Sequence, residues 1–316
     1  MHTDTLASLT AEDGPAAIKA CFESDGAFVM RDLFDAELIR QARASLRALL
    51  HSAGWVHAPD GEALRANLGM RCADPDLSYV RTYRRALALA VVHRLPHSES
   101  VRALAIALGI NDLFVLPRLV LRLVFPGTSP TPPHQDWTTI RGSQDAATIW
   151  VPLMPCQLDD GPVAVIKASH HAGVWPRGKG RGIGGEIVLA GDSAVWSAAE
   201  LDVGDAVVFR ALTVHRALPN VTDRMRLSMD FRIQDMAQPI HPGSLLPPDR
   251  FRSWDEVYRS WRDPDLDFAH YWRGRHPRAD PSVAGSRAER EDDSHRPAAG
   301  APHSSAHRDD ERRMTR

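Results

Sequence analysis

The chain has 316 residues, of which 43% are hydrophobic and 25% are charged, and its formal net charge at pH 7 is −2. These values fit a globular protein with one large domain or two ordinary ones. No excess of Lys and Arg is available to neutralise phosphates, which argues against a general nucleic-acid-binding protein. The sequence has no apolar run of about 18 residues, so we expect no membrane-spanning helix.

The first residues and the cysteines indicate the cellular compartment. Residues 1–13 lack the basic and apolar parts of a secretion signal. The three cysteines, Cys21, Cys72 and Cys156, are an odd number without the spacing of a metal site. They are best explained as thiols in a reducing compartment, so we expect a cytoplasmic protein. The oligomeric state is not predicted.

The first third of the chain predicts helices around one short strand. Four segments have helical apolar spacing or helix-favouring composition: 15–24, 35–50, 83–93 and 98–108. Residues 26–30 are apolar and predict a strand. Residues 52–80 show little periodicity and predict a long loop of the kind that often covers a substrate, as do the glycine-rich residues 172–192.

From Arg118 the apolar period changes to two, which is typical of strands. In residues 118–125 leucines occupy one face, whereas Arg118 and Arg122 occupy the other. This pattern predicts a strand whose second face lines a polar cavity, although arginines facing solvent are an equally good interpretation. Further strands are expected around His134 and at 146–151, 163–166, 194–196, 206–209 and 226–232. Many short strands without βαβ alternation predict an antiparallel barrel or jelly roll.

The C-terminal part predicts an aromatic helix and then a tail. Trp254, Tyr258 and Trp261 have helical spacing, and after about residue 275 apolar residues nearly vanish. We expect one domain over residues 1–275, with the jelly-roll core at about 115–235. Residues 276–316 are expected to be disordered because they cannot bury enough apolar surface.

The stretch Pro133-His134-Gln135-Asp136-Trp137 carries the chemistry that we expect of this chain. In an extended strand, His134 and Asp136 would point to the same face. Together with His215 they would form a 2-His-1-carboxylate triad, which holds Fe(II) and leaves positions open for O2 and an organic co-ligand. An isolated His-x-Asp occurs often by chance, and polar residues on a strand surface are the simpler alternative.

Arg226 and Ser228 follow His215 on a predicted strand and share one face. A guanidinium matches the geometry of a carboxylate, and a hydroxyl can add one more hydrogen bond. A 2-oxoglutarate-dependent oxygenase needs such partners for the distal carboxylate of its co-substrate. Arg122 is a further candidate for contacting a carboxylate of 2-oxoglutarate or of the substrate.

Over about residues 15–235 the sequence resembles the phytanoyl-CoA dioxygenase family of Fe(II)/2-oxoglutarate oxygenases. Besides the histidine motif, the shared stretches are Asp25-Gly26-Ala-Phe-Val, Trp150-Val-Pro-Leu, and Asp160-Gly161-Pro-Val-Ala-Val-Ile-Lys-Ala-Ser169-His170. The resemblance implies a double-stranded β-helix with flanking helices. It also implies that His134, Asp136 and His215 bind iron and that Arg226, assisted by Ser228, binds 2-oxoglutarate. One departure is Lys167-Ala168, where the family often has Pro-Gly.

The resemblance implies a dioxygenase that hydroxylates an unactivated C–H bond of a small molecule. Fe(II), 2-oxoglutarate and O2 are the expected cofactor and co-substrates, succinate and CO2 are the expected by-products, and ascorbate is a candidate stimulant. Halogenating relatives replace the carboxylate with a small residue, so Asp136 favours hydroxylation. Two alternatives stay open: desaturation or ring closure by the same oxidant in natural-product biosynthesis, and a jelly-roll protein that binds a metal or ligand without catalysis. The sequence does not identify the substrate.

Overall fold

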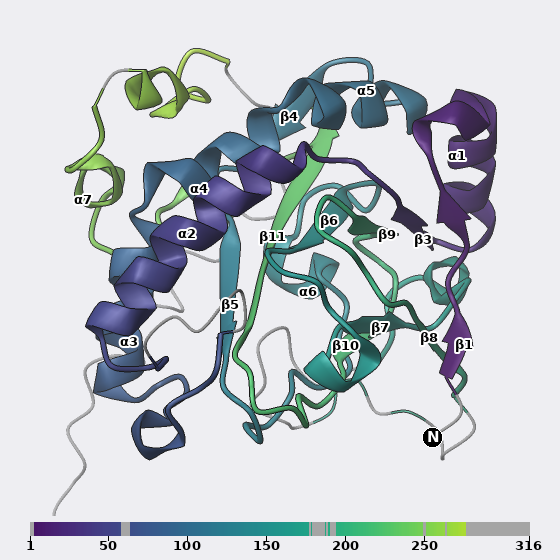
Figure 1. Cartoon of the computed structure of the whole chain (residues 1–316). Helices are drawn as coiled ribbons and strands as arrows, with labels where there is room; N and C mark the ends of the chain where they lie inside the picture. Colours follow the sequence, from purple (N-terminus) through teal and green to yellow (C-terminus); the bar gives the residue numbers. More distant parts are fainter. Residues whose placement is uncertain are drawn as a thin grey trace, which may run out of the picture. The chain divides into compact units, whose positions relative to one another are not determined.

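In a computed structural model of the chain, the parts that the structure describes are residues 3–57, 64–176, 178, 187, 189, 194–248, 251–262 and 264–275. Within these ranges the chain forms two β-sheets with helices packed beside the larger one (Figure 1). None of the helices in the described ranges combines the length and the apolar character needed to cross a bilayer. The tail predicted over 276–316 lies outside the described residues, so the proposed domain boundary stays a prediction.

The N-terminal part of the chain supplies most of the helices. Its elements are β1 (Thr3–Thr5), β2 (Ser8–Leu9), α1 (Gly14–Ser24), β3 (Ala27–Met30), α2 (Ala36–Ser52), α3 (Leu77–Leu87), α4 (Ala90–Arg94) and α5 (Glu99–Ala107). Asp35 caps α2, because its carboxylate accepts a hydrogen bond of 2.7 Å from the backbone N–H of Glu37. The single helix predicted over 83–93 is wrong: α3 ends at Leu87, and α4 begins at Ala90 as a separate helix.

The remaining elements are mainly strands. They are β4 (Leu113–Val115), β5 (Val120–Val124), α6 (Trp137–Ile140), β6 (Ala147–Pro152), β7 (Val163–Val165), β8 (Trp196–Ala198), β9 (Ala206–Arg210), β10 (His215–Ala217), β11 (Arg226–Asp235) and α7 (Trp254–Tyr258). The larger sheet has the order β2-β3-β9-β6-β11-β4, and β5 also pairs with β11. The smaller sheet has the order β1-β8-β7-β10. This pair of sheets confirms the predicted jelly-roll class.

Strand β11 lies inside the larger sheet, between β6 on one side and β4 and β5 on the other, so both of its faces are buried. The apolar face of β11 carries Leu227, Met229, Phe231 and Ile233. These side chains belong to the large core that also contains buried side chains of α2 and α5. The other face of β11 carries buried polar side chains: Arg226, Ser228, Asp230 and Arg232. Burying four polar groups is costly unless each finds a partner or a ligand. This face of β11 therefore marks the candidate site.

The C-terminal aromatic residues form a separate apolar cluster. Trp254 and Tyr258 lie in α7 with their ring centroids 5.6 Å apart, and Trp261 follows just after the helix. All three are buried together with Trp272. The predicted aromatic packing of this segment is therefore confirmed, although the helix ends before Trp261.

Candidate active site

His134 and His215 come from distant parts of the sequence and meet as a backbone pair. The N–H of each donates to the carbonyl of the other over 2.9 Å. The ring Nδ1 of His134 lies 2.8 Å from the carbonyl of Pro132, and that of His215 lies 3.0 Å from the carbonyl of Thr213. Because a carbonyl can only accept, Nδ1 must be the protonated nitrogen in each ring. Each Nε2 then keeps its lone pair for a metal ion.

Asp136 completes the group, but not in the way the sequence suggested. The extended strand predicted at His134 is wrong, because only one isolated bridge forms there and Asp136 has the helical angles φ −61° and ψ −35° at the start of α6. Its Oδ1 nevertheless lies 3.9 Å from Nε2 of His134 and 3.7 Å from Nε2 of His215. One ligand atom from each of the three buried residues lies within 4.8 Å of the others.

Two residues that the sequence analysis did not single out hold the carboxylate of Asp136. Its Oδ2 accepts hydrogen bonds from the Thr148 hydroxyl at 2.6 Å and from Nε of Arg232 at 3.1 Å. Nη2 of Arg232 donates to both oxygens, at 2.9 Å to Oδ1 and 2.8 Å to Oδ2. Thr148 and Arg232 are directly paired across β6 and β11, which aims both side chains at the same carboxylate.

The ion pairs continue along the same face of β11. Nη2 of Arg232 lies 2.7 Å from Oδ2 of Asp230, and Nε of Arg122 lies 3.1 Å from Oδ1 of Asp230. Positive and negative side chains thus alternate from Arg122 to Asp136. The sequence signal for this network was the placement of Asp230 and Arg232 on the face that also carries Arg226.

The charge states suit metal binding. Burial, together with the nearby His215, lowers the pKa of His134 to about 3, and burial also lowers the pKa of His215. Burial alone would raise the pKa of Asp136, but the Arg232 guanidinium and the two imidazoles outweigh it and hold that pKa well below its usual value. At neutral pH the site therefore offers two neutral imidazoles and one carboxylate.

Arg226 is a buried guanidinium, and no ion pair of it is found among the described residues. It is 4% exposed, its Nη1 donates to the Ser228 hydroxyl at 3.0 Å, and its Nε has no hydrogen-bond partner within the described part of the chain. Burial lowers its pKa to about 10, which still leaves it protonated at neutral pH. Its guanidinium carbon lies 5.6 Å from the centroid of the Trp150 ring. A buried cation of this kind is suited to binding an anionic ligand.

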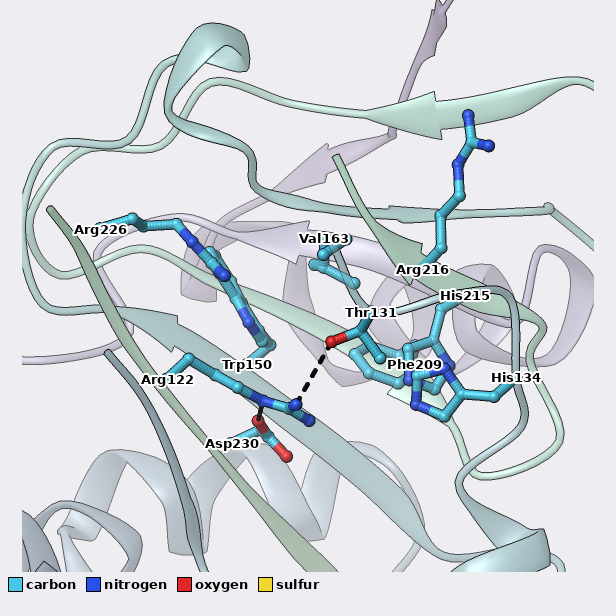
Figure 2. Close-up of a pocket in the computed structure, with 11 residues that line it drawn as sticks. Arg122, Thr131, His134, Trp150, Val163, Phe209, His215, Arg216, Arg226 and Asp230 are labelled. Carbon is cyan, nitrogen blue, oxygen red and sulfur yellow. Dashed lines mark hydrogen bonds and ion pairs between the residues drawn. The ribbon is translucent and has the colours of Figure 1, made fainter. Parts of the chain in front are cut away.

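A cavity with about 360 Å³ of empty space, including its opening to solvent, connects His134 and His215 with Arg226. Figure 2 shows the imidazoles of His134 and His215 on one side and Arg226 with Trp150 on the other. Arg122 also lines this cavity, with its Nη1 3.5 Å from the hydroxyl of Thr131. The predicted contact of Arg122 with a carboxylate stays a prediction, because its Nε is engaged by Asp230.

A second cavity, with about 1310 Å³ of empty space including its opening to solvent, reaches two of the three candidate ligands, His134 and Asp136. His134, Asp136 and Arg232 lie in its wall, and most of its other lining is apolar or aromatic: Tyr79, Val80, Tyr83, Leu116, Leu119, Leu121 and Ile140. Arg118 also lines it. Asp74, Tyr79 and Val80 come from the region predicted as a lid, although α3 makes the end of that region helical. Much of the other predicted lid, 172–192, lies outside the described residues.

The adjacent His170 and His171 have structural roles. They lie in a 3-10 turn with their ring centroids 4.0 Å apart. Their Nε2 atoms each lie 3.1 Å from a carbonyl at the end of α1, those of Glu23 and Ser24. Ala168, where the family often has glycine, keeps the turn by adopting a left-handed φ of 59°.

Comparisons with known proteins agree with this geometry. A segment of the chain is 37% identical over 119 residues to 1-deoxypentalenic acid 11-beta-hydroxylase from Streptomyces exfoliatus, covering 33% of this chain and 41% of that protein. The chain therefore spans less than half the length of this curated relative. The corresponding enzyme from Streptomyces arenae is 36% identical over the same length, with the same shares of both chains covered.

Two solved structures share the fold. The apo non-heme monooxygenase ThoJ has a TM-score of 0.51 and 22% identity, covering 80% of this chain and 94% of that one. EvdO2 from Micromonospora carbonacea var. aurantiaca, solved with 2-oxoglutarate, has a TM-score of 0.50 and 19% identity, covering 78% of this chain and 98% of that one. At these identities the likeness shows the fold.

The family model described as phytanoyl-CoA dioxygenase (PhyH) matches residues 22–228, which is more than half of the chain. This range contains the three candidate ligands, Arg226 and Ser228. It also agrees with the resemblance that the sequence motifs indicated. The chain belongs to the phytanoyl-CoA dioxygenase family.

Proposed function

We propose that the chain is an Fe(II)- and 2-oxoglutarate-dependent dioxygenase that hydroxylates an unactivated C–H bond of a small-molecule metabolite. The observation that carries this proposal is the cavity that runs from the imidazoles of His134 and His215 to the Arg226 guanidinium. It supplies metal ligands at one end and a buried cation at the other. Membership in the family and the local similarity to a hydroxylase support the same activity.

The ligand group fits Fe(II). Two neutral Nε2 atoms from His134 and His215 and Oδ1 of the ionised Asp136 form a 2-His-1-carboxylate set, which suits non-haem Fe(II). Bound there, Fe(II) would activate O2 with 2-oxoglutarate as its co-ligand. The Nδ1 contacts with backbone carbonyls would fix the orientation of both rings.

The rest of the cavity fits 2-oxoglutarate. Arg226 and Ser228 would hold the distal carboxylate, because the guanidinium is protonated and its Nε has no partner in the described residues. Trp150, Val163 and Phe209 line the cavity and would contact the methylene groups of the co-substrate. Arg122 would add a second positive charge to the cavity wall.

The second cavity would hold the substrate. Its largely apolar wall suits a hydrocarbon framework, and it reaches His134 and Asp136, so a C–H bond of a molecule bound there would face the metal ligands. In the net reaction, one oxygen atom of O2 enters the product as hydroxyl. The other oxygen atom enters succinate, which forms from 2-oxoglutarate with loss of CO2.

The test is succinate formation by the purified protein with Fe(II), 2-oxoglutarate, ascorbate and air, combined with mass spectrometry of candidate substrates. A product heavier by one oxygen atom supports hydroxylation. A product lighter by two hydrogens would instead assign desaturation or ring closure. Stable metal binding without succinate formation across a broad substrate panel would assign a non-catalytic binding protein.

The proposal implies a small-molecule substrate as the partner of the site. Cys21, Cys72 and Cys156 are all free, which supports the cytoplasmic location expected from the sequence.

A further inference from the structure

Arg232 forms an unusually complete interaction with a candidate metal ligand. Its guanidinium contacts both oxygens of Asp136 at 2.8 to 3.1 Å, and its side chain is only 7% exposed. The proposed reaction does not itself require a cation at this position, because Arg226 provides the anion-binding group. The presence of a further buried cation, Arg232, directly beside Asp136 therefore calls for its own explanation.

The two oxygens of Asp136 have different surroundings. Oδ2 accepts hydrogen bonds from the Thr148 hydroxyl and from two nitrogens of Arg232. These bonds occupy the lone pairs of Oδ2. Oδ1 accepts only from Nη2 of Arg232 among the described residues and faces the Nε2 atoms of both histidines. This asymmetry leaves Oδ1 as the oxygen available to a metal ion.

The guanidinium also places a positive charge beside the candidate metal site. A cation bound to Oδ1 would share that oxygen with Nη2 of Arg232, which lies 2.9 Å away. All of these groups are buried, so the repulsion between like charges is screened less than it would be in water. The same Nη2 of Arg232 also pairs with Oδ2 of Asp230 at 2.7 Å, which helps to hold the guanidinium in place.

We infer that Arg232 is a positioning residue that keeps Asp136 a one-oxygen ligand and lowers the affinity of the site for divalent cations. The inference rests on the proposed function, because it treats the three residues as a metal site. By sharing the charge of Asp136, Arg232 makes the ligand set less anionic. It would thereby favour Fe(II) over Fe(III) and slow oxidation of the resting enzyme.

Removing Arg232 has two opposite effects on metal binding. Asp136 loses part of its positioning, which weakens binding, but the nearby positive charge also disappears, which strengthens it. Thr148 would still hold Oδ2 through its 2.6 Å hydrogen bond, and the carboxylate would stay buried. The loss of repulsion therefore decides the sign, and the metal should bind more tightly.

The experiment uses the full chain stripped of metal and titrated with Mn(II) by calorimetry. Arg232→Gln is expected to bind Mn(II) at least tenfold more tightly than the wild type. The spectrum of the Co(II) form should also change as the second oxygen of Asp136 becomes available. Arg224→Gln is the matched control, because Arg224 pairs with the buried Asp160 at 2.9 Å but lines neither cavity.

The double variant Asp230→Asn/Arg232→Gln carries the same test if the single variant does not fold, since it removes the charge of Asp230 together with that of its partner Arg232. Equal or weaker Mn(II) binding in whichever of the two variants folds overturns the inference, as does a wild type that binds no Mn(II). If the wild type forms succinate normally but the variants bind Mn(II) with unchanged affinity, only this inference about Arg232 is rejected. If the variants bind Mn(II) more tightly than the wild type but no form of the protein produces succinate, the proposed dioxygenase activity is rejected instead.

Discussion

The indole of Trp150 lies against the guanidinium of Arg226, 5.6 Å from ring centroid to guanidinium carbon. The ring covers the cation while the Ser228 hydroxyl accepts from its Nη1. This arrangement fixes a planar, charged fork at one end of the cavity. It makes Arg226 the residue whose replacement should separate co-substrate binding from metal binding.

Arg226→Lys is expected to raise the KM for 2-oxoglutarate at least tenfold. Lysine keeps the charge but loses the two-pronged geometry, and charge-assisted hydrogen bonds contribute about 1.5 to 3 kcal/mol each. Initial rates of succinate formation at varied 2-oxoglutarate measure the effect. Arg224→Lys serves as the control. An unchanged KM with intact Mn(II) binding would remove Arg226 from its proposed role.

Ser228→Ala should have a smaller effect of the same kind. A single hydrogen bond to a charged group is lost while Arg226 remains, so we expect a loss of about 1 to 2 kcal/mol in co-substrate binding. That corresponds to roughly a five- to thirtyfold rise in the KM for 2-oxoglutarate. The same rate measurements check it, and an effect larger than that of Arg226→Lys would contradict the assignment.

His215→Ala should abolish both high-affinity Mn(II) binding and succinate formation. The substitution removes one of three ligands, and the buried pair of His134 and Asp136 cannot complete the set. Calorimetric titration of the metal-free protein provides the measurement, with circular dichroism to verify folding. His171→Ala is the matched control, because its ring contacts the carbonyl of Ser24 outside the cavities. Full activity of His215→Ala would exclude the proposed metal site.

The stability of the fold should fall on acidification because of His93. This buried ring lies 2.8 Å from the carbonyl of Leu87, and burial lowers its pKa to about 4. Since that value lies below the unfolded value of about 6.5, its contribution is complete above pH 6.5 and is lost as pH falls towards 4. The expected loss from about pH 7.5 to about pH 5 is on the order of 2 kcal/mol.

Urea unfolding at several pH values tests this dependence. His93→Gln should reduce the pH dependence, with a residual slope from His97, His134 and His215, whose pKa values burial also lowers. Replacement of the exposed His51 by Gln should leave the profile unchanged. A wild-type stability that does not vary between these pH values would be inconsistent with the buried, neutral His93.

The alternation of residues in 226–232 was sufficient to predict the central strand of the site. It placed Arg226, Ser228, Asp230 and Arg232 on one face, and the structure shows all four side chains buried at the candidate site. The sequence could not show which of these side chains meet Asp136 and which meet the cavity. That division depends on pairing across β6 and β11, which brings Thr148 opposite Arg232.

The prediction for His134 and Asp136 brought the right residues together for a partly wrong reason. A two-residue spacing places side chains on one face only in an extended chain, whereas here the backbone turns into α6 at Asp136. Buried Gln135 holds this turn by donating to the carbonyls of Leu212 and Gly173. Such long-range contacts leave no periodic signal in the sequence.

The pair of backbone hydrogen bonds between His134 and His215 links formation of the proposed metal site to closure of the chain. Residues 134 and 215 lie far apart in the sequence, so bringing them together costs conformational entropy that the contacts of the intervening strands offset. Their amide protons should therefore exchange with deuterium only through large openings of the barrel. A chain that has not yet closed has no assembled binding site, so iron would be captured late in folding and would then slow those openings.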